Sequence, residues 1–127
     1  EMTDRVIRAL EYPEVDILAH PTGRILNRRQ PFAMDVEAVL QAAATLQVAV
    51  ELNAHPSRLD LHDRHLRRAK ELGVKVAVST DAHSARDLGL MRYGVDQAAR
   101  GWLEPADVLN TMPLADFQVW RQRRTGP

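Results

Sequence analysis

The stretch that decides the fold runs from Val74 to His83 and reads VKVAVSTDAH. Its first six residues are mostly apolar and rich in valine, a composition that favours a short buried strand. Gly73 stands directly before them, and glycine often ends a helix because it accepts a left-handed backbone. The last four residues are largely polar and include Asp81. The stretch therefore predicts a helix, a buried strand and a polar loop in succession, the repeating unit of α/β proteins.

The same succession occurs twice earlier in the chain. Residues 15–19 form an apolar run that ends at His20-Pro21, and residues 48–52 form a second run followed by a polar loop. Apolar spacing predicts helices at 2–11, 35–46, 60–73 and 85–100, a short one from Pro105, and a last one to Arg123, with 125–127 fraying. Such alternation forms parallel βαβ units. Three strands are too few to close a barrel, so we expect part of a larger one.

The composition is that of an ordinary globular domain. Of the 127 residues, 45% are hydrophobic and 27% are charged, so we expect a single domain over residues 1–127. The 17 basic and 17 acidic residues give a formal net charge of zero, which argues against a freestanding nucleic-acid binder. The absence of cysteine excludes disulfides, thiolate metal sites and cysteine nucleophiles.

The sequence contains no pattern of a targeting or membrane segment. No apolar run approaches the ~20 residues that span a bilayer, and the first residues lack the basic and apolar regions of a signal peptide. The chain instead opens directly into a helical pattern. We therefore expect a fragment of a cytoplasmic protein that continues an upstream part of the same polypeptide and does not contact a membrane.

Asp81 and His83 are the first candidates for a metal site. Residues two apart in an extended segment point the same way, so this carboxylate and this imidazole can face the same ions. Oxygen and nitrogen ligands of this kind suit Zn, Mn or Fe. The alternative is that Asp81 caps the following helix. The carboxyl ends of parallel strands form the active-site edge of α/β proteins, which supports the metal interpretation without excluding the cap.

His20 is the matching candidate at the end of the first strand. Pro21 restricts it to extended backbone conformations, so its side chain is expected to project from the strand end. The alternative is a surface histidine beside a turn. His62 and His65 are three residues apart on a predicted helix and can share a face, but their charged surroundings favour a solvated or capping role.

Polar residues also accompany the second strand. Glu51 interrupts its apolar run, and a buried carboxylate needs a partner, either Arg58 or the residues around the site. Asn53 and His55 follow at the end of the strand. We expect Glu51, Asn53 and His55 to lie next to the metal ligands and to orient them without binding the metal themselves.

Arginines are the candidates for phosphate contacts. Arg24, Arg28 and Arg29 lie in the long loop after the first strand, and the guanidinium fork binds phosphate oxygens in pairs. A solvated loop is the alternative. The arginines near the end of the chain are expected at an exposed helix terminus, where cations suit the helix dipole; they are Arg121, Arg123 and Arg124.

The motifs together resemble a known family. Residues 79–83, STDAH, resemble the late Asp-x-His motif of PHP (polymerase and histidinol phosphatase) domains, and residues 16–21, DILAHP, resemble their His-Pro motif. Further segments resemble the PHP domain of bacterial family X DNA polymerases in particular. They are HPTGR at 20–24, Arg28-Arg29, Pro31-Phe32 with Asp35, VELNA at 50–54, PSRLDL at 56–61, RGWL at 100–103 and VLNT at 108–111.

This resemblance implies a fold and an activity. PHP domains are distorted β/α barrels with a trinuclear site for divalent metal ions, Mn or Zn. The matching motifs make His20, Asp81 and His83 metal ligands, and no further catalytic residue is assigned. The implied activity is a metal-dependent phosphoesterase, the 3′–5′ exonuclease of a DNA repair polymerase, which processes DNA ends and contacts DNA through the complete protein.

Parts of the family pattern are missing from the chain. The early His-x-His motif and the middle Glu and His ligands would lie upstream of Glu1, as would the polymerase domain. The chain alone is therefore expected to bind metal poorly, to fold poorly with an open sheet edge, and to be inactive. Nor does the pattern give His55 a role.

Two other functions stay open. One is a small-molecule phosphatase of the same superfamily, similar to histidinol phosphatase, although the arginine-bearing loop and the tail motifs argue against it. The other is a structural PHP module that has lost its activity. The three retained ligands argue against such decay in this part of the domain.

Overall fold

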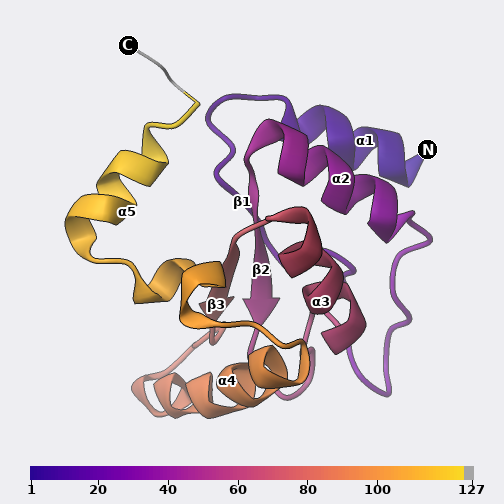
Figure 1. The fold of residues 1–127 in the computed structure, drawn as a ribbon. Coiled ribbons are helices and arrows are strands. Elements are labelled where there is room, and N and C mark those ends of the chain that lie inside the picture. The colour runs from indigo at the N-terminus through magenta and orange to yellow at the C-terminus, as the bar shows by residue number, and fades with distance from the viewer. Residues whose placement is uncertain (125–127) are drawn as a thin grey trace.

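The three predicted strands form one parallel sheet. A computed structural model describes residues 1–124, so the expected fraying of residues 125–127 lies outside the described part. Strands β1 (Ile17–Leu18), β2 (Ala49–Asn53) and β3 (Val76–Ser79) lie side by side in that order (Figure 1). The register pairs Ile17 with Ala49 and Val50 with Val76. The α/β arrangement of parallel strands is confirmed, and the sheet is open, consistent with part of a barrel.

Helices alternate with the strands, as the sequence predicts. The α-helices are α1 (Met2–Leu10), α2 (Val36–Leu46), α3 (Asp63–Leu72), α4 (Met91–Arg100) and α5 (Leu114–Arg121). Short 3-10 helices span Ala85–Leu90, Pro105–Asp107 and Leu109–Thr111. Helix α2 packs against both α1 and α3, and α4 packs against β2 and β3, whereas α5 stands apart (Figure 1). No helix within residues 1–124 is long and apolar enough to cross a membrane.

The core lies between the helices and one face of the sheet. Neighbouring residues of a parallel pair share a face, so Leu52 of β2 and Val78 of β3 point the same way. Both are buried, together with Leu40 of α2 and Leu66 of α3. The alternation of side chains turns Glu51 to the opposite face. Packing on one face therefore leaves the other face of the sheet free to carry polar residues.

Helix α2 begins where the sequence predicts, but α3 does not. The Asp35 side chain accepts a hydrogen bond from Ala38 N at 3.0 Å and caps α2. The predicted start of α3 at residue 60 is wrong, because the helix begins at Asp63 with His62 as its cap. Asp60 is instead fully buried and binds other parts of the chain. Gly73 ends α3 in a left-handed conformation with φ of 76°, as expected.

The predicted helix at 85–100 is two segments. A 3-10 helix over Ala85–Leu90 precedes α4. Asp87 in that first segment accepts a hydrogen bond from His83 N at 3.0 Å, which ties it to the polar loop after β3. Gly94 then allows α4 to approach the sheet closely, because a Cβ atom there would lie 2.6 Å from Val78 Cγ1.

The arginines at the end of the chain are not all exposed, so that prediction is wrong for two of them. The Arg123 side chain, only 10% exposed, donates to Gln47 O at 2.6 Å and to Asp16 Oδ1 at 3.0 Å. Arg124 donates to Val15 O and Leu10 O at 2.6 and 2.7 Å. Carbonyl oxygens at the ends of helices and in loops need donors, and these guanidinium groups supply them. The C-terminal segment therefore holds the loop that leads into β1.

Candidate functional site

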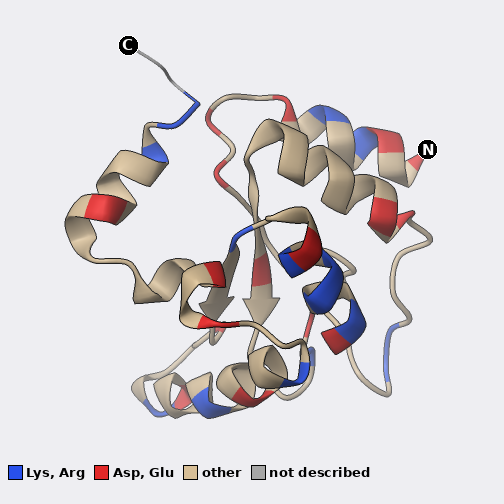
Figure 2. Ribbon diagram, in the orientation of Figure 1, with Lys and Arg blue, Asp and Glu red and all other residues tan. Residues whose placement is uncertain are grey.

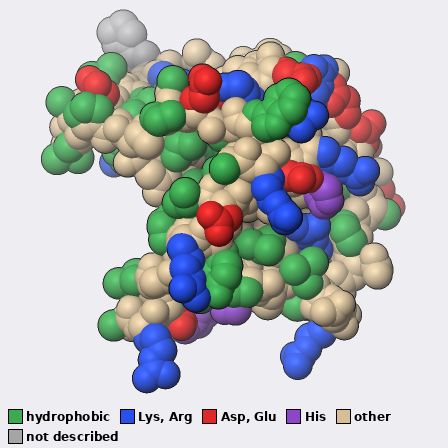
Figure 3. Space-filling model, turned by 60° about the horizontal axis from the view of Figure 1, so that its bottom comes forward, with side chains coloured by type: hydrophobic (Ala, Val, Ile, Leu, Met, Phe, Trp, Pro, Cys, Tyr) green, Lys and Arg blue, Asp and Glu red, His purple; other side chains and the backbone are tan. Residues whose placement is uncertain are grey.

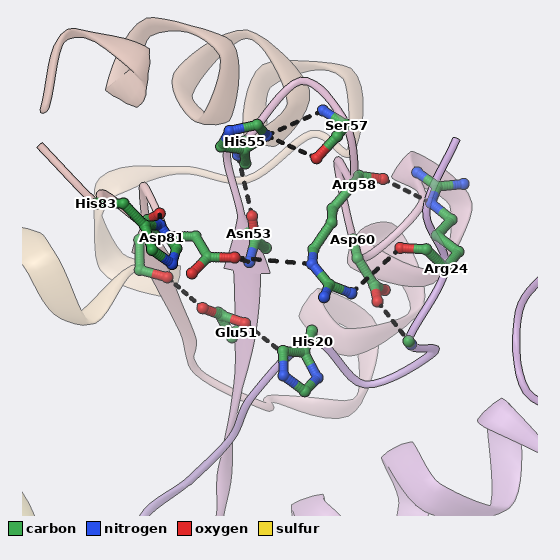
Figure 4. A network of polar contacts seen from close by, with 12 residues as sticks. His20, Arg24, Glu51, Asn53, His55, Ser57, Arg58, Asp60, Asp81 and His83 are labelled. Atoms are coloured by element: carbon green, nitrogen blue, oxygen red, sulfur yellow. Dashed lines mark hydrogen bonds and ion pairs between the residues drawn. The ribbon is translucent and has the colours of Figure 1, made fainter. Parts of the chain in front are cut away.

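Polar side chains from all three strands meet at the carboxyl edge of the sheet. His20 follows β1, Glu51 belongs to β2, and Asp81 and His83 follow β3. Figure 4 shows these side chains around the end of β2, together with Asn53. The parallel order β1-β2-β3 brings them together although they are far apart in sequence. This is the edge at which α/β proteins place their sites.

Glu51 connects the two neighbouring strand ends. One of its carboxylate oxygens accepts a hydrogen bond from His20 N at 2.5 Å, and the other accepts one from the Ser79 hydroxyl (Figure 4). Hydrogen bonds to an ionised carboxylate are stronger than those between neutral groups. Its partners are therefore His20 and Ser79 rather than Arg58, the partner considered from the sequence. Glu51 thus fixes the spacing of the three strand ends.

The Asp81 carboxylate is held by side chains from the loop after β2. Its Oδ2 atom accepts from Asn53 Nδ2 at 3.2 Å and lies 3.7 Å from Arg58 Nε. Asn53, 1% exposed, also accepts from His55 N at 3.0 Å. Asp81 does not cap the helix that follows, because Ser84 occupies the N-cap position there. The carboxylate is thus oriented from the β2 side, and these contacts leave its Oδ1 atom for another partner.

His83 is oriented by the backbone of its own loop. Its Nδ1 atom lies 2.7 Å from Asp81 O. A carbonyl oxygen only accepts, so Nδ1 carries the proton in this contact. The Nε2 atom then presents a lone pair from an exposed ring. Histidines that bind metals commonly have one ring nitrogen anchored in this way.

His20 lies at the same edge, but its backbone differs from the expectation. The proline that follows predicts an extended conformation, whereas φ of His20 is 29°. The chain turns here because Gly23 N donates to His20 O at 2.9 Å while His20 N is bound by Glu51. The predicted extended backbone is therefore wrong. The exposed His20 ring projects from a turn and not from the end of a strand.

The donor types at this edge suit a divalent metal ion, but they do not form a complete site. Imidazole nitrogen and carboxylate oxygen are ligands of Zn and Mn. Within residues 1–124, however, no three His, Asp or Glu side chains are grouped closely enough to hold an ion. The roles of His20, Asp81 and His83 as ligands therefore stay predictions that need further donors.

The arginines of the long loop differ in their surroundings. Arg24 donates from Nε to Arg58 O at 2.9 Å and from a second nitrogen to Leu59 O. Arg58 returns a hydrogen bond to Arg24 O at 3.4 Å. Arg28 and Arg29 are exposed. Figure 2 shows basic residues interspersed with acidic ones along the chain, and in Figure 3 the basic side chains form no continuous face in view.

Asp60 is an important residue that the sequence reasoning missed. Its carboxylate accepts from Thr22 N at 3.1 Å and from Gly23 N at 3.0 Å, and so fixes the loop after His20. Burial raises the pKa of Asp60, although these hydrogen bonds and the nearby Arg24 charge oppose the rise. Its place before an apolar residue is also typical of a helix cap, so no local signal distinguished the two roles.

His55 is turned toward its own loop. Its Nδ1 atom accepts from Ser57 N at 3.2 Å and lies 2.7 Å from Ser57 Oγ. These contacts close a turn directly after β2. Its backbone contact with Asn53 supports the arrangement around Asp81, but its ring is bound elsewhere.

Comparison with known proteins finds relatives of this chain. No protein-family model matches the chain. It is 42% identical over 119 residues to the DNA polymerase/3′-5′ exonuclease PolX of Bacillus subtilis (strain 168), covering 94% of the chain and 21% of PolX. It is 32% identical over 115 residues to a probable phosphatase of Thermoanaerobacter sp. (strain X514), covering 86% of the chain and 44% of that protein. A probable phosphatase of Shewanella sp. (strain ANA-3) is 30% identical over 132 residues, 95% of the chain and 48% of the relative.

A parallel sheet with a polar carboxyl edge and these relatives define the class: the chain is homologous to PHP-family phosphoesterases. More particularly, it is homologous to PolX, and the predicted relationship is confirmed. The chain spans about a fifth of the length of PolX and less than half of the two phosphatases.

Proposed function

We propose that the chain is the C-terminal part of the PHP domain of a PolX-type DNA polymerase, where it contributes to a metal-dependent 3′–5′ exonuclease that processes DNA ends in repair. The observation that carries the proposal is the placement of His20, Asp81 and His83 at one sheet edge in a chain 42% identical to PolX. The remaining ligands would come from upstream parts of the polypeptide.

His20, Asp81 and His83 would hold divalent ions such as Mn or Zn. When bound, such ions activate a water molecule and stabilise charge on the phosphorus oxygens. Asn53 orients Asp81 through one oxygen and leaves the other available. The contact of His83 Nδ1 with Asp81 O directs the Nε2 atom outward. These residues therefore preorganise ligands before any ion binds.

Other side chains would contact the substrate. The exposed guanidinium groups of Arg28 and Arg29 can reach phosphate oxygens along a DNA strand. Arg24 holds two backbone carbonyls with part of its guanidinium group and would bind phosphate with the nitrogen that remains. Arg58, beside Asp81, offsets negative charge at the site.

The test uses the complete gene product. We expect wild-type protein to contain bound divalent metal and to shorten DNA from its 3′ end, and Asp81→Ala to lose most of both, because a charged oxygen donor is removed. Metal content and release of nucleotides are measured. Asp96→Ala, on the exposed side of α4, is the matched control and should retain both. Wild-type protein without metal and without cleavage would point to a structural module and contradict the proposal.

A small-molecule phosphatase is the second candidate, favoured by the 32% identity to a probable phosphatase over 86% of the chain. Comparing hydrolysis of 3′-ended DNA with that of a simple phosphate monoester separates the two. A clear preference for the monoester would replace the exonuclease proposal.

A further inference from the structure

A polar cavity lies beside the loop after β1 and is not lined by the three predicted ligands. Its volume is about 400 Å³, and it lies between the loop after β1 and the first turn of α3. We call it the α3 cavity. Among the residues that line it are Thr22, Arg24, Phe32, His62, Arg64 and His65. None of His20, Asp81 and His83 lines this cavity, so it is separate from the proposed metal site.

The acidic side chains of the cavity wall have partners, and so do two of its basic ones: Arg24 donates to Arg58 O, and His62 binds Asp63. Glu37 is bound by Arg68 at 2.7 Å, and Asp35 caps α2. Arg64 is exposed, and its guanidinium group has no partner within residues 1–124. Figure 2 shows further basic residues along α3. Arg64 is therefore a lining residue whose guanidinium group is available to a ligand.

Two buried polar atoms in the cavity wall also lack partners. Thr22 is 4% exposed, and its hydroxyl has no hydrogen-bond partner within residues 1–124. His65 Nδ1 is likewise buried without a hydrogen-bond partner. More than nine in ten buried polar groups in proteins are paired. A ligand that accepts hydrogen bonds would satisfy both atoms at once.

The first turn of α3 contributes its dipole rather than free donors. The N-terminus of a helix carries partial positive charge, but Arg64 N donates to Asp63 and His65 N donates to His62 O. Asp63 is acidic there, but its carboxylate is bound by His62 Nδ1 at 2.6 Å and by Arg64 N at 2.7 Å. Burial lowers the pKa of His65 most, the charges of Arg64, His62 and Arg24 lower it further, and Asp63 opposes them.

We propose that the α3 cavity binds a phosphate group through Arg64, His65 and the Thr22 hydroxyl. A guanidinium group, an imidazole and a hydroxyl together offer charged and neutral donors to a tetrahedral anion. The DNA part of this proposal rests on the exonuclease function: the phosphate would belong to the DNA backbone away from the 3′ end being cleaved. Free inorganic phosphate has the same chemistry and is the other source.

The complete gene product is titrated with inorganic phosphate in one arm and a short single-stranded oligonucleotide in the other, both with EDTA present so that metal ions contribute nothing. We expect Arg64→Ala to raise the Kd about tenfold in both arms, the loss of one charged hydrogen bond. Arg8→Ala on α1, exposed and equal in charge change, is the control and should leave both Kd values unchanged. Thr22→Val keeps the backbone contact to Asp60 and should weaken phosphate binding as well.

Failure of the phosphate-site proposal can be distinguished from failure of the exonuclease proposal. Asp81→Ala should lose metal and cleavage but keep phosphate binding in EDTA. If Arg64→Ala weakens phosphate but not oligonucleotide binding, the site serves free phosphate and the DNA assignment is overturned. If Arg64→Ala and Thr22→Val bind both ligands like wild type, the cavity is not a phosphate site.

Discussion

At the scale of single residues, the candidate site depends on carboxylates whose surroundings differ. Glu51 and Asp81 accept hydrogen bonds at the open carboxyl edge of the sheet. Asp60 is buried and satisfies two backbone N–H groups of the loop after His20. Nothing in the sequence distinguishes the roles of these three acidic residues. Only their environments assign Glu51 and Asp81 to the candidate site and Asp60 to holding the loop.

The first prediction concerns Asp60. Asp60→Ala leaves the amides of Thr22 and Gly23 buried without an acceptor, at a cost of about 3 kcal/mol of unfolding free energy. Asp60→Asn keeps an acceptor oxygen and should cost clearly less. Urea unfolding gives the free energies, and hydrogen exchange at Thr22 and Gly23 locates the change. Equal stability of wild type and Asp60→Ala would show that the carboxylate does not hold the loop.

The pH dependence of these variants has a definite sign. Burial raises the pKa of Asp60 in the folded protein, so folding favours the protonated form. The stabilisation that Asp60 gains from this pKa shift is complete below the ordinary pKa of aspartate. It is lost as pH rises through the raised pKa of the folded protein. Wild type should therefore lose stability over that pH range relative to Asp60→Asn, which does not titrate.

At the scale of elements, close packing of α4 on the sheet shapes the loop that carries Asp81 and His83. A Cβ atom at Gly94 would lie 2.6 Å from Val78 Cγ1 and 2.7 Å from Ala54 Cβ. These neighbours belong to β3 and to the residue after β2, the two strands that lead into the site. The distance of α4 from the sheet is thus set by a single missing methyl group.

The second prediction follows from this contact. Gly94→Ala should destabilise the protein by about 1–3 kcal/mol, as overpacking does, despite the better helix propensity of alanine. Gly89→Ala is the control, because a Cβ atom there meets nothing within 4 Å. Thermal unfolding of both variants is compared with wild type. A Gly94→Ala variant as stable as Gly89→Ala would mean that α4 shifts freely.

At the scale of the whole molecule, the C-terminal segment returns to the beginning of the sheet. Arg123 contacts Asp16, which is 107 positions away in sequence, and Gln47 at the end of α2. Arg124 contacts Leu10 O at the end of α1. The segment after α5 therefore joins parts of the chain that no local interaction connects.

The third prediction tests this connection. Arg123→Ala should lower stability by about 2 kcal/mol, because its hydrogen bonds are charged and its side chain is almost buried. Arg121→Ala is the matched control, since its exposed ion pair with Asp16, at 3.8 Å, should contribute less than about 1 kcal/mol. Hydrogen exchange in residues 10–18 should rise in the first variant alone. An equal rise in hydrogen exchange in both variants would show that Arg123 does not hold this segment more than Arg121 does.

Sequence alone determined the succession of elements and the edge where the candidate site lies. Strand β3, the Gly73 terminus of α3 and the Asp35 cap of α2 each depend on residues within one turn or one strand. Local alternation and capping act over such distances, so a sequence pattern contains them. The placement of His20, Asp81 and His83 at the carboxyl edge followed from strand polarity.

Only the tertiary structure decided the roles of residues whose partners are distant. Asp60 binds residues 37 and 38 positions away, and Glu51 binds His20 31 positions away. The α3 cavity combines a loop with a helix, and Arg123 reaches across the chain. Such contacts are specified by the packing of whole elements, which no short sequence window contains. Local propensity therefore fixed the elements, and packing fixed which polar groups satisfy one another.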